Sequence, residues 1–478
     1  MTKFKLVIPN FLGGFAPAWY LNSYASYGNK NMAGDMTNCD LFDPAGITQG
    51  PGLTSLTNGT DAGVMSTLLR GILDEAIASN KTYAVGGNMV YQLASASVVN
   101  TTAAPESPHG VSGTAVALED VAYYRNEIFY SYNTTASAQV GRIKTLTAFD
   151  DDWGTVSAGA TVSAGGPLPL EAGENDMLYL GNMNRVSSWD GSAWINADLD
   201  LPKDSEIQDL KWIMNRLFVV ANRPDLTGNH KVTGSIYVYD GASDSWEYEI
   251  RPGGRVGGLF IDCGILYVFY QDVTLTGGYK LGYISGGNIK EVASFPGSLP
   301  QYYQVTKYKN FILWVSGGLL YAFGAIDKSL PSMLFQYADG GYSTVGGLAT
   351  PFGTPIVAST QSTSFKVAKL ANYDKTSSWK SLMFPVGKSV LEKMNVYFDA
   401  ITTNARADLT ITANRGQTSY TAGTNIINTN DNSLRRKQFN LGIPIDNDFR
   451  VEINWANGSS ANPVRINRIE IFGESAEE

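Results

Sequence analysis

Short apolar runs alternate with polar turns along most of this chain, and one passage shows the pattern clearly. Between Asn215 and Trp246, apolar residues fill 217–220 and again 236–239, with a polar loop between the two runs and a Gly-containing turn after them. β-Branched and aromatic residues occupy both runs, whereas Asn, Asp, Gly and Pro occupy the gaps. This distribution predicts a β-hairpin followed by a tight turn.

The beginning of that passage recurs along the chain. A turn residue followed by an apolar and aromatic run starts at Asn80, Asn126, Asn175, Asn215, Cys263 and Asn310, with a weaker seventh copy at Thr354. A period near 45 residues with several short strands per unit is typical of β-propeller blades and not of helical solenoids. The repeat therefore predicts a β-propeller of six or seven blades, with seven favoured. A non-repetitive β-sandwich is the alternative.

Three strands can be placed in most repeat units. An inner apolar run precedes each anchor, the anchored strand follows it, and a third strand comes next. The inner runs are 121–124, 210–214, 259–261 and 305–308, and the third strands are 89–93, 142–146, 185–189, 236–239, 280–284 and 319–323. We expect the Asn or Gly at each anchor to supply the positive φ that a two-residue hairpin turn requires.

The periodicity changes at about Ser381. From there apolar and polar residues alternate strictly in five segments, which are 391–399, 407–413, 438–441, 449–455 and 464–471. Period-two alternation is typical of strands with one buried and one solvated face. We therefore predict an all-β chain in which residues 76–380 form the propeller and residues 381–478 form a small β-sandwich. The alternative is that the last strands form additional blades.

Residues 1–75 do not fit the repeat. Pro and Gly recur there too often for an independent core, so we expect an extended N-terminal arm that lies along the propeller or a neighbouring subunit. Four aromatic side chains are the candidate interface residues that would anchor it: Phe11, Phe15, Trp19 and Tyr20. The alternative is that this segment is the first hairpin of the propeller.

The composition agrees with an all-β protein rich in turns. Aromatic residues make up 12% of the 478 residues, 50 residues are Gly, and only 17% are charged, which is unlike a disordered or helical chain. No apolar run reaches the length of a membrane span, and Pro9 interrupts the N-terminus before a signal-peptide core could form. Cys39 and Cys263 are expected to be free thiols in a reducing compartment.

The net charge of −9 argues against nucleic-acid binding as the main task, because phosphate contacts need concentrated Lys and Arg. The basic cluster at 435–437 is interpreted as a solvated turn.

The sequence offers little catalytic chemistry. We predict no catalytic, cofactor-binding or metal-binding residue. The two histidines, His109 and His230, are expected in exposed loops, and no nucleophile motif, phosphate-binding motif or dinucleotide-binding motif is present. Asp150–Asp152 lack the alternating spacing of calcium loops and are expected to form a solvated turn. We therefore expect no enzymatic activity.

Two Asp-Gly phrases followed by Trp resemble turns of known propellers. Ser188–Trp194 resembles the Asp-box of sialidases with one residue missing between Asp and Gly, and 234–246 resembles a kelch blade. In both, the Asp-Gly pair is predicted to make the turn and the Trp to pack between blades. Trp246 is accordingly expected to lie between neighbouring blades.

A family resemblance lies between Asn38 and Leu53. This segment reads NCDLFDPAGITQGPGL, with Gly46-Ile47 followed by Pro51-Gly52. The order resembles the N-terminal signature of tailed-bacteriophage tail proteins that are built on a β-propeller, of the tail nozzle or tail hub type, although Gly50 stands where that family often has Arg. The ending at 463–473 is similar to the last strand of the jelly-roll-like sandwich in those proteins.

The resemblance implies a viral structural protein of the virion tail, assembled in the bacterial host cytoplasm. Its propeller subunits would form a homo-oligomeric ring that extends the DNA-exit channel. The implied partners are other tail proteins, such as an adaptor, a tube or fibres, and DNA would pass transiently without sequence-specific binding. The alternative is a carbohydrate-binding or carbohydrate-cleaving propeller at the host surface. A kelch-type interaction adaptor would leave the N-terminal arm unexplained.

Overall fold

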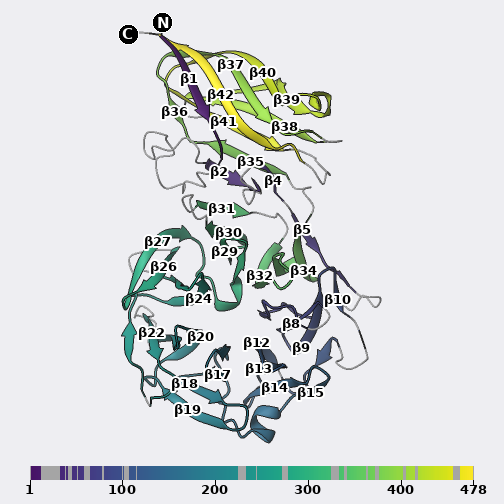
Figure 1. Cartoon of the computed structure of the whole chain (residues 1–478), viewed down its shortest axis with the longest axis vertical. Coiled ribbons are helices and arrows are strands. Elements are labelled where there is room, and N and C mark those ends of the chain that lie inside the picture. Colours follow the sequence, from purple (N-terminus) through teal and green to yellow (C-terminus); the bar gives the residue numbers. More distant parts are fainter. Residues whose placement is uncertain are drawn as a thin grey trace.

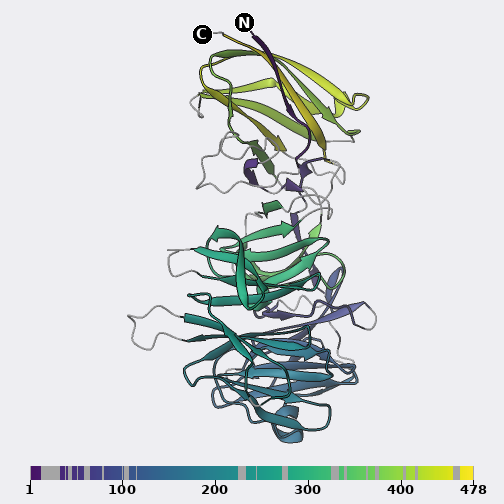
Figure 2. The same ribbon diagram turned by 60° about the vertical axis from the view of Figure 1, so that its left-hand side comes forward.

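The computed structural model describes residues 2–11, 33–37, 39–40, 46–50, 52–58, 65–77, 80–99, 101, 107–114, 116–223, 233–243, 245–271, 278–324, 333–337, 342–361, 364–371, 376–401, 405–414, 418–455 and 463–476. Strands dominate these residues and build two bodies, a ring of sheets and a sandwich at one edge of the ring (Figure 1). The sandwich stays at the same end when the molecule is turned (Figure 2), so the molecule is elongated. None of the helices in these ranges is long and apolar enough to cross a membrane.

Seven sheets form the ring in the described part of the chain, which confirms the β-propeller and its favoured count of seven blades. Blade 1 contains β7 (Gly71–Ile72), β8 (Lys81–Gly86), β9 (Met89–Ala94) and β10 (Ser97–Val99), joined by β6 (Thr57–Asn58) and β11 (His109–Gly110). Blade 2 contains β12 (Ala117–Tyr124), β13 (Glu127–Asn133), β14 (Ala138–Lys144) and β15 (Ala148–Asp150). Blade 3 contains β16 (Leu170–Gly173), β17 (Met177–Asn182), β18 (Arg185–Trp189) and β19 (Trp194–Asp200).

The remaining blades follow the same plan. Blade 4 contains β20 (Glu206–Ile213), β21 (Arg216–Arg223), β22 (Thr233–Tyr239) and β23 (Tyr248–Ile250). Blade 5 contains β24 (Val256–Asp262), β25 (Ile265–Tyr270), β26 (Gly278–Ser285) and β27 (Asn288–Pro296), and blade 6 contains β28 (Val305–Tyr308), β29 (Phe311–Ser316), β30 (Leu319–Gly324) and β31 (Met333–Tyr337). Blade 7 contains β32 (Tyr342–Ala349), β33 (Ile356–Gln361) and β34 (Ser364–Ala371), and its fourth strand is β5 (Gly52–Ser55).

The turn residues that define the repeat join the first two strands of a blade. Met214 and Asn215 both have positive φ, at 54° and 56°, between β20 and β21, and Cys263 and Gly264 have positive φ between β24 and β25. Two consecutive residues in this region are what a type I′ hairpin requires. The prediction is confirmed at these turns and at Asn80 and Asn126, whereas in blade 3 the neighbouring Asp176 takes the positive φ instead of Asn175.

The ring is closed by a strand from the N-terminal segment. β5 pairs antiparallel with β34 and so supplies the outer strand of blade 7. Because the last blade borrows a strand from residues near the N-terminus, the two ends of the propeller sequence are held together by backbone hydrogen bonds. This placement corrects the expected extended arm of residues 1–75, since part of that segment is integral to the propeller.

The sandwich likewise contains strands from both ends of the chain. One sheet has the order β1 (Thr2–Ile8), β42 (Ile466–Ser475), β37 (Ser389–Phe398) and β40 (Arg436–Ile445). The other has the order β2 (Ala33–Thr37), β35 (Ser377–Ser381), β41 (Asp448–Trp455), β38 (Arg406–Ala413) and β39 (Thr418–Asn428), with β36 (Phe384–Pro385) beside β41. All five predicted strands are present. The boundary expected at residue 381 falls at the end of β35, and β1 and β2 belong to the sandwich.

A short connection leads from the sandwich into the propeller. β3 (Cys39–Asp40) pairs with β4 (Thr48–Gln49), and Ile47 exchanges two 2.9 Å backbone hydrogen bonds with Ile466 of β42. A Cβ on Gly46 would lie 2.5 Å from the carbonyl oxygen of Ile466. Only glycine allows this close approach. Residues of the family-like segment thus have a structural role at the junction.

One hydrophobic core joins the sandwich to the propeller. Buried Trp379, Phe449 and Ile471 of the sandwich belong to the same packed cluster as Leu313 and Leu348 of blades 6 and 7. Continuous packing of this kind opposes independent motion of the two bodies. The sandwich is therefore docked on the rim of the ring next to blades 6 and 7, as Figure 1 shows.

Of the four candidate interface residues, Phe11 lies within the described part of the chain, and its environment differs from the one expected. Phe11 is only 1% exposed and lies in the sandwich core. It cannot serve as an exposed anchor for a neighbouring subunit, because its ring is already covered by residues of its own chain. Phe15, Trp19 and Tyr20 lie outside the described residues.

Candidate functional site

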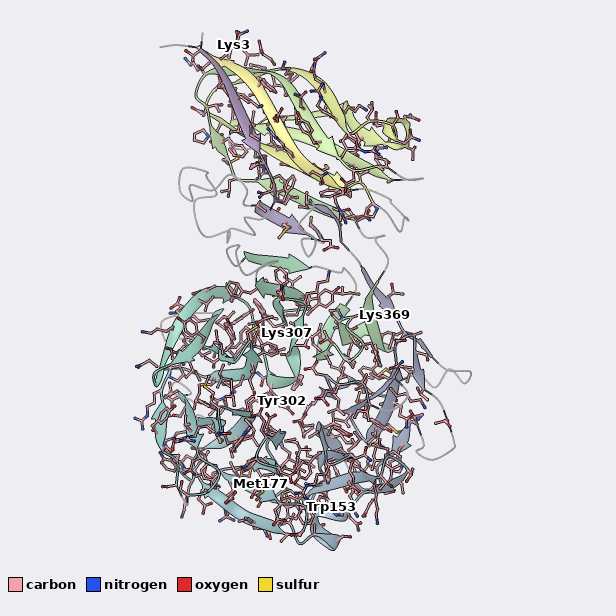
Figure 3. All side chains as sticks on the ribbon, in the orientation of Figure 1. Lys3, Trp153, Met177, Tyr302, Lys307 and Lys369 are labelled. Carbon is pink, nitrogen blue, oxygen red and sulfur yellow. The ribbon has the colours of Figure 1, made fainter. Side chains whose placement is uncertain are left out.

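The innermost strands of the blades surround a central channel. A cavity of about 380 Å³ lies there, lined by residues from every blade, including Asp120 of blade 2, Glu171 of blade 3 and Lys211 of blade 4. Figure 3 places Tyr302 in the middle of the ring. Central cavities are the usual place to look for a ligand site, so the chemistry of these polar residues decides what the propeller can do.

Two channel aspartates hold neighbouring blades together. Asp120 follows a bulge in β12 and accepts a 2.8 Å hydrogen bond from the backbone N–H of Leu170 in the next blade. Asp209 follows the equivalent bulge in β20 and accepts a 2.7 Å bond from the N–H of Leu259. The second oxygen of each carboxylate accepts from the N–H of the following residue, at 2.8 Å. A bulge redirects a side chain locally, and here it turns each carboxylate toward the adjacent blade.

Asp74 makes a similar connection where the ring closes. Its Oδ1 accepts a 2.9 Å hydrogen bond from the N–H of Thr350, which follows β32 of blade 7. The same oxygen accepts a 2.7 Å hydrogen bond from the hydroxyl of Thr306 in blade 6. One carboxylate therefore links the beginning of the repeat to its last two blades.

Lys211 is the cation at the centre of these carboxylates. Its Nζ lies 3.1 Å from Oε2 of Glu171, and Oε1 of Glu171 accepts a 2.9 Å hydrogen bond from the N–H of Trp212. The Lys211 side chain is 30% exposed, and this exposure faces the channel that it lines. Glu171 thus joins blade 3 to blade 4 through a charge pair and a backbone bond together.

Burial shifts the protonation of these groups. Desolvation raises the pKa of both Asp120 and Asp209 to about 7, although the backbone hydrogen bonds and Lys211 oppose the shift. Burial by itself would lower the pKa of Lys211. The attraction of the nearby Glu171 and Asp209 carboxylates is larger, so the pKa of Lys211 is raised. The lysine remains charged, and it offsets part of the repulsion among the surrounding acids.

A tyrosine crosses the channel. Tyr302 begins the short 3-10 helix η2 (Tyr302–Gln304) before blade 6, and its hydroxyl donates a 3.0 Å hydrogen bond to the carbonyl oxygen of Glu119 in blade 2. The Glu119 side chain in turn pairs with Arg70. Because blades 2 and 6 are not neighbours, this bond spans the ring and narrows the opening.

These contacts define what the channel can do chemically. The carboxylates of Asp74, Asp120, Asp209 and Glu171 accept hydrogen bonds from backbone N–H groups of neighbouring blades. These four carboxylates therefore have a structural role in the ring. Sequence patterns did not single out these acids, because the partners of Asp120, Glu171 and Asp209 lie about one blade further along the chain and those of Asp74 lie in the last two blades.

His109 and Asp151 differ from the expected exposed loop and solvated turn. Nε2 of His109 lies 3.0 Å from Oδ1 of Asp151, and its ring stacks on Phe149 with 3.7 Å between ring centroids. Burial by itself would raise the pKa of Asp151. Hydrogen bonds from His109 and Tyr130 have the larger effect, so the pKa of Asp151 is lowered. Asp151 is therefore part of a contact between blades 1 and 2 and not a solvated turn. His230 lies outside the described residues.

The Asp-Gly turns have the predicted structural role. Oδ1 of Asp190 accepts hydrogen bonds from the backbone N–H groups of Ser192 and Ala193 at 2.7 and 2.8 Å, and Oδ1 of Asp240 makes the equivalent bonds in blade 4. Trp194 is buried between blades 2 and 3, and Trp246 is partly buried against the cluster between blades 3 and 4.

Both cysteines are free thiols, as expected. Cys39 is buried in the sandwich core, whereas Cys263 is exposed at a turn of blade 5.

Comparison with known proteins supports no function. No protein-family model matches this sequence, and no curated protein matches it. Among solved structures, a chain in a crystal structure of the mitotic checkpoint complex is 14% identical, with a TM-score of 0.43 over 68% of this chain and 95% of the other. An oxidoreductase (glucose dehydrogenase) from Thermus thermophilus is 9% identical, with a TM-score of 0.36 over 67% of this chain and 99% of the other. Similarities this distant carry no argument about activity or partners.

Proposed function

We propose that this protein is a structural component of a bacteriophage tail, a propeller subunit that assembles into a ring of the tail nozzle or hub. The observation that carries the proposal is the use of the channel carboxylates. Asp120, Glu171 and Asp209 bind backbone N–H groups of successive blades, so these channel carboxylates tie the blades to one another. The family-like segment around Gly46 and Ile47 adds support.

Strands from the N-terminal segment are built into both bodies. β1 and β2 complete the sandwich and β5 completes blade 7, so this segment is held in the sandwich and in the propeller by strand pairing. In this proposal DNA passes through the ring formed by several subunits. The channel within one propeller is not the path, because Tyr302 crosses it.

The partners in this proposal are further copies of the chain and other tail proteins, such as an adaptor, a tube or fibres, in the virion tail. Negative-stain imaging of the purified chain, alone and with a candidate adaptor protein, tests it. We expect closed rings with rotational symmetry and a central opening. Particles that remain single propellers in both samples would contradict it.

A carbohydrate-binding or carbohydrate-cleaving propeller is the second candidate. The observation that favours it is the channel cavity of about 380 Å³, a size within the usual range of small-molecule sites. Incubation of the protein with surface glycan of a bacterial host, followed by measurement of reducing sugar, distinguishes the two. We expect no release of sugar. Release that is abolished by Glu171→Gln, with the fold retained, would favour the second candidate.

A further inference from the structure

Glu75 lines the channel cavity without taking part in the contacts between blades. It follows Asp74 after β7 of blade 1, and it is exposed to solvent. Within the described ranges its carboxylate makes no hydrogen bond and no ion pair. Asp120, Glu171 and Asp209, by contrast, bind backbone N–H groups of the next blade. Glu75 is therefore a free acceptor inside the channel.

Asp74 adds a second free oxygen to the lining of the cavity. Its Oδ1 accepts the hydrogen bonds from Thr350 and Thr306, whereas its Oδ2 accepts none from any residue that the structure describes. Asp74 is exposed like Glu75, so solvent in the channel reaches both side chains. Two adjacent residues thus offer carboxylate oxygens to a ligand that carries hydrogen-bond donors.

Negative charge predominates in the lining of the cavity. The acidic residues outnumber Lys211, which is the single cation among the described lining residues, and they are Asp74, Glu75, Asp120 and Glu171. The Lys211 ammonium already lies 3.1 Å from Glu171. Arg70, near Tyr303 of the lining, is already paired with Glu119. A cavity lined mainly by one sign of charge attracts ligands of the opposite sign, so this channel favours a cation.

An organic cation fits this lining better than a metal ion does. In the part of the chain that the structure describes, no three His, Cys, Asp or Glu side chains lie close enough to hold a metal. Apolar side chains from blades 1, 5 and 7 complete the wall, and they are Ile72, Phe260, Ile261 and Leu348. The volume of about 380 Å³ admits a small molecule. A ligand with one cationic end and an apolar body can contact both kinds of wall.

Tyr303 supplies a further polar contact in the lining. Its ring stands edge to face against Tyr302, with 5.1 Å between the ring centroids. Its hydroxyl makes no hydrogen bond to any described residue. A hydroxyl oxygen can accept a hydrogen bond from an ammonium group, and the face of an aromatic ring attracts a cation. Tyr303 can therefore contact a cation in either way.

We propose that the central channel binds a small organic cation whose primary ammonium group is held by Glu75 and Asp74. The three N–H donors of the ammonium match the free carboxylate oxygens and the Tyr303 hydroxyl, and charge-assisted hydrogen bonds are stronger than neutral ones. The apolar body of the ligand lies against Phe260 and Ile261. This inference goes beyond the proposed tail function and does not depend on it, because a single propeller contains the whole site.

An NMR titration of the full chain with benzylamine tests the site, because this probe carries a primary ammonium group at neutral pH. Benzyl alcohol is the matched neutral probe of similar shape. Glu75→Gln removes the charge of a carboxylate that has no structural partner in the described residues. Glu392→Gln is the matched control, because it makes the same change at an exposed position of β37 in the sandwich. Thermal melting of both variants checks that the fold is intact.

We expect benzylamine to bind the wild type and the Glu392→Gln variant equally well. Benzyl alcohol with the wild type, and benzylamine with Glu75→Gln, should each bind at least about tenfold more weakly, because a charge-assisted hydrogen bond is lost. Glucose should not displace benzylamine from the wild type.

Absence of benzylamine binding, equal affinity for the two probes, or wild-type affinity in Glu75→Gln would each overturn the proposal. If the Glu75→Gln variant does not fold, the comparison of the two probes on the wild type still decides. Displacement of benzylamine by glucose would overturn the choice of a cation and favour the carbohydrate alternative. Ring formation is tested separately by negative-stain imaging, so failure of this site would leave the tail function standing.

Discussion

Phe11 meets Trp379 edge to face in the core of the sandwich. The ring centroids are 4.9 Å apart and the ring planes lie at 85° to each other. Phe11 follows the first strand of the chain, whereas Trp379 lies in β35 at the start of the C-terminal part of the sandwich. The N-terminal residues are thus anchored inside their own chain by an aromatic pair.

Phe11→Ala is expected to destabilise the sandwich by about 3 to 5 kcal/mol, because it removes a fully buried aromatic side chain and leaves a cavity. Urea unfolding followed by tryptophan fluorescence measures the change. Lys3→Ala, in an exposed position of the same terminal segment, should stay within about 0.5 kcal/mol of the wild type. An unchanged unfolding midpoint for Phe11→Ala would show that the contact contributes little.

Removal of residues 1–50 is expected to unfold the sandwich while leaving the propeller. The deletion takes away β1, β2, Phe11 and the Ile47 bridge to β42, but it retains β5. Limited proteolysis with mass spectrometry should therefore show rapid cleavage beyond residue 381 and a protected propeller. A second deletion that extends through residue 58 should also open blade 7. If the sandwich resists the protease equally well in the first deletion variant and in the full chain, the assignment of these strands is contradicted.

Lys211→Met is expected to destabilise the propeller by about 2 to 4 kcal/mol. The change leaves Glu171 and the nearby Asp209 without their central cation, and unpaired buried charges are costly. Combining it with Glu171→Gln should recover part of the loss, since the uncompensated charge is then removed. Thermal unfolding of the single and double variants measures the coupling. Purely additive losses would show that the charge pair is not the source of the effect.

The channel aspartates predict a pH dependence of stability. Asp120 and Asp209 have pKa values raised to about 7 in the folded protein, above the ordinary value near 4 expected in the unfolded chain. Their contribution is therefore fully present below pH ~4 and is lost as pH rises through ~7. Asp209→Asn should flatten the fall in unfolding free energy across this window. Urea unfolding at a series of pH values between ~4 and ~8 measures this slope, and a fall as steep as that of the wild type would contradict the prediction.

Trp246→Ala is expected to cost about 1 to 3 kcal/mol, less than a fully buried tryptophan, because its side chain is only partly buried. Its ring packs against Tyr237 with 5.0 Å between ring centroids, beside the core between blades 3 and 4. Equilibrium urea unfolding tests this structural role. A wild-type midpoint together with lost binding to a host glycan would instead indicate a sugar-stacking residue.

Much of the architecture was predictable because its signals are local. The run 217–220 and the turn at Asn215 specify β21 and its hairpin through side-chain alternation and positive φ. The same reasoning located the third strands of the blades and five strands of the sandwich. The fourth strand of each blade was not predicted, because it is an outer strand of few residues in several blades, such as β15 and β23.

The sequence by itself determined the repeat, a count of six or seven blades with seven favoured, the change to a sandwich near residue 381 and the structural role of the Asp-Gly turns. Only the tertiary structure decided that Thr2–Ile8 pairs with β42, that β5 closes the ring and that Phe11 is buried. It also decided that Asp120, Glu171 and Asp209 link successive blades. The physical reason is distance along the chain. A turn or an alternating strand is specified by neighbouring residues, whereas the partner of a terminal strand or a channel carboxylate is tens to hundreds of residues away and becomes known only when the ring closes.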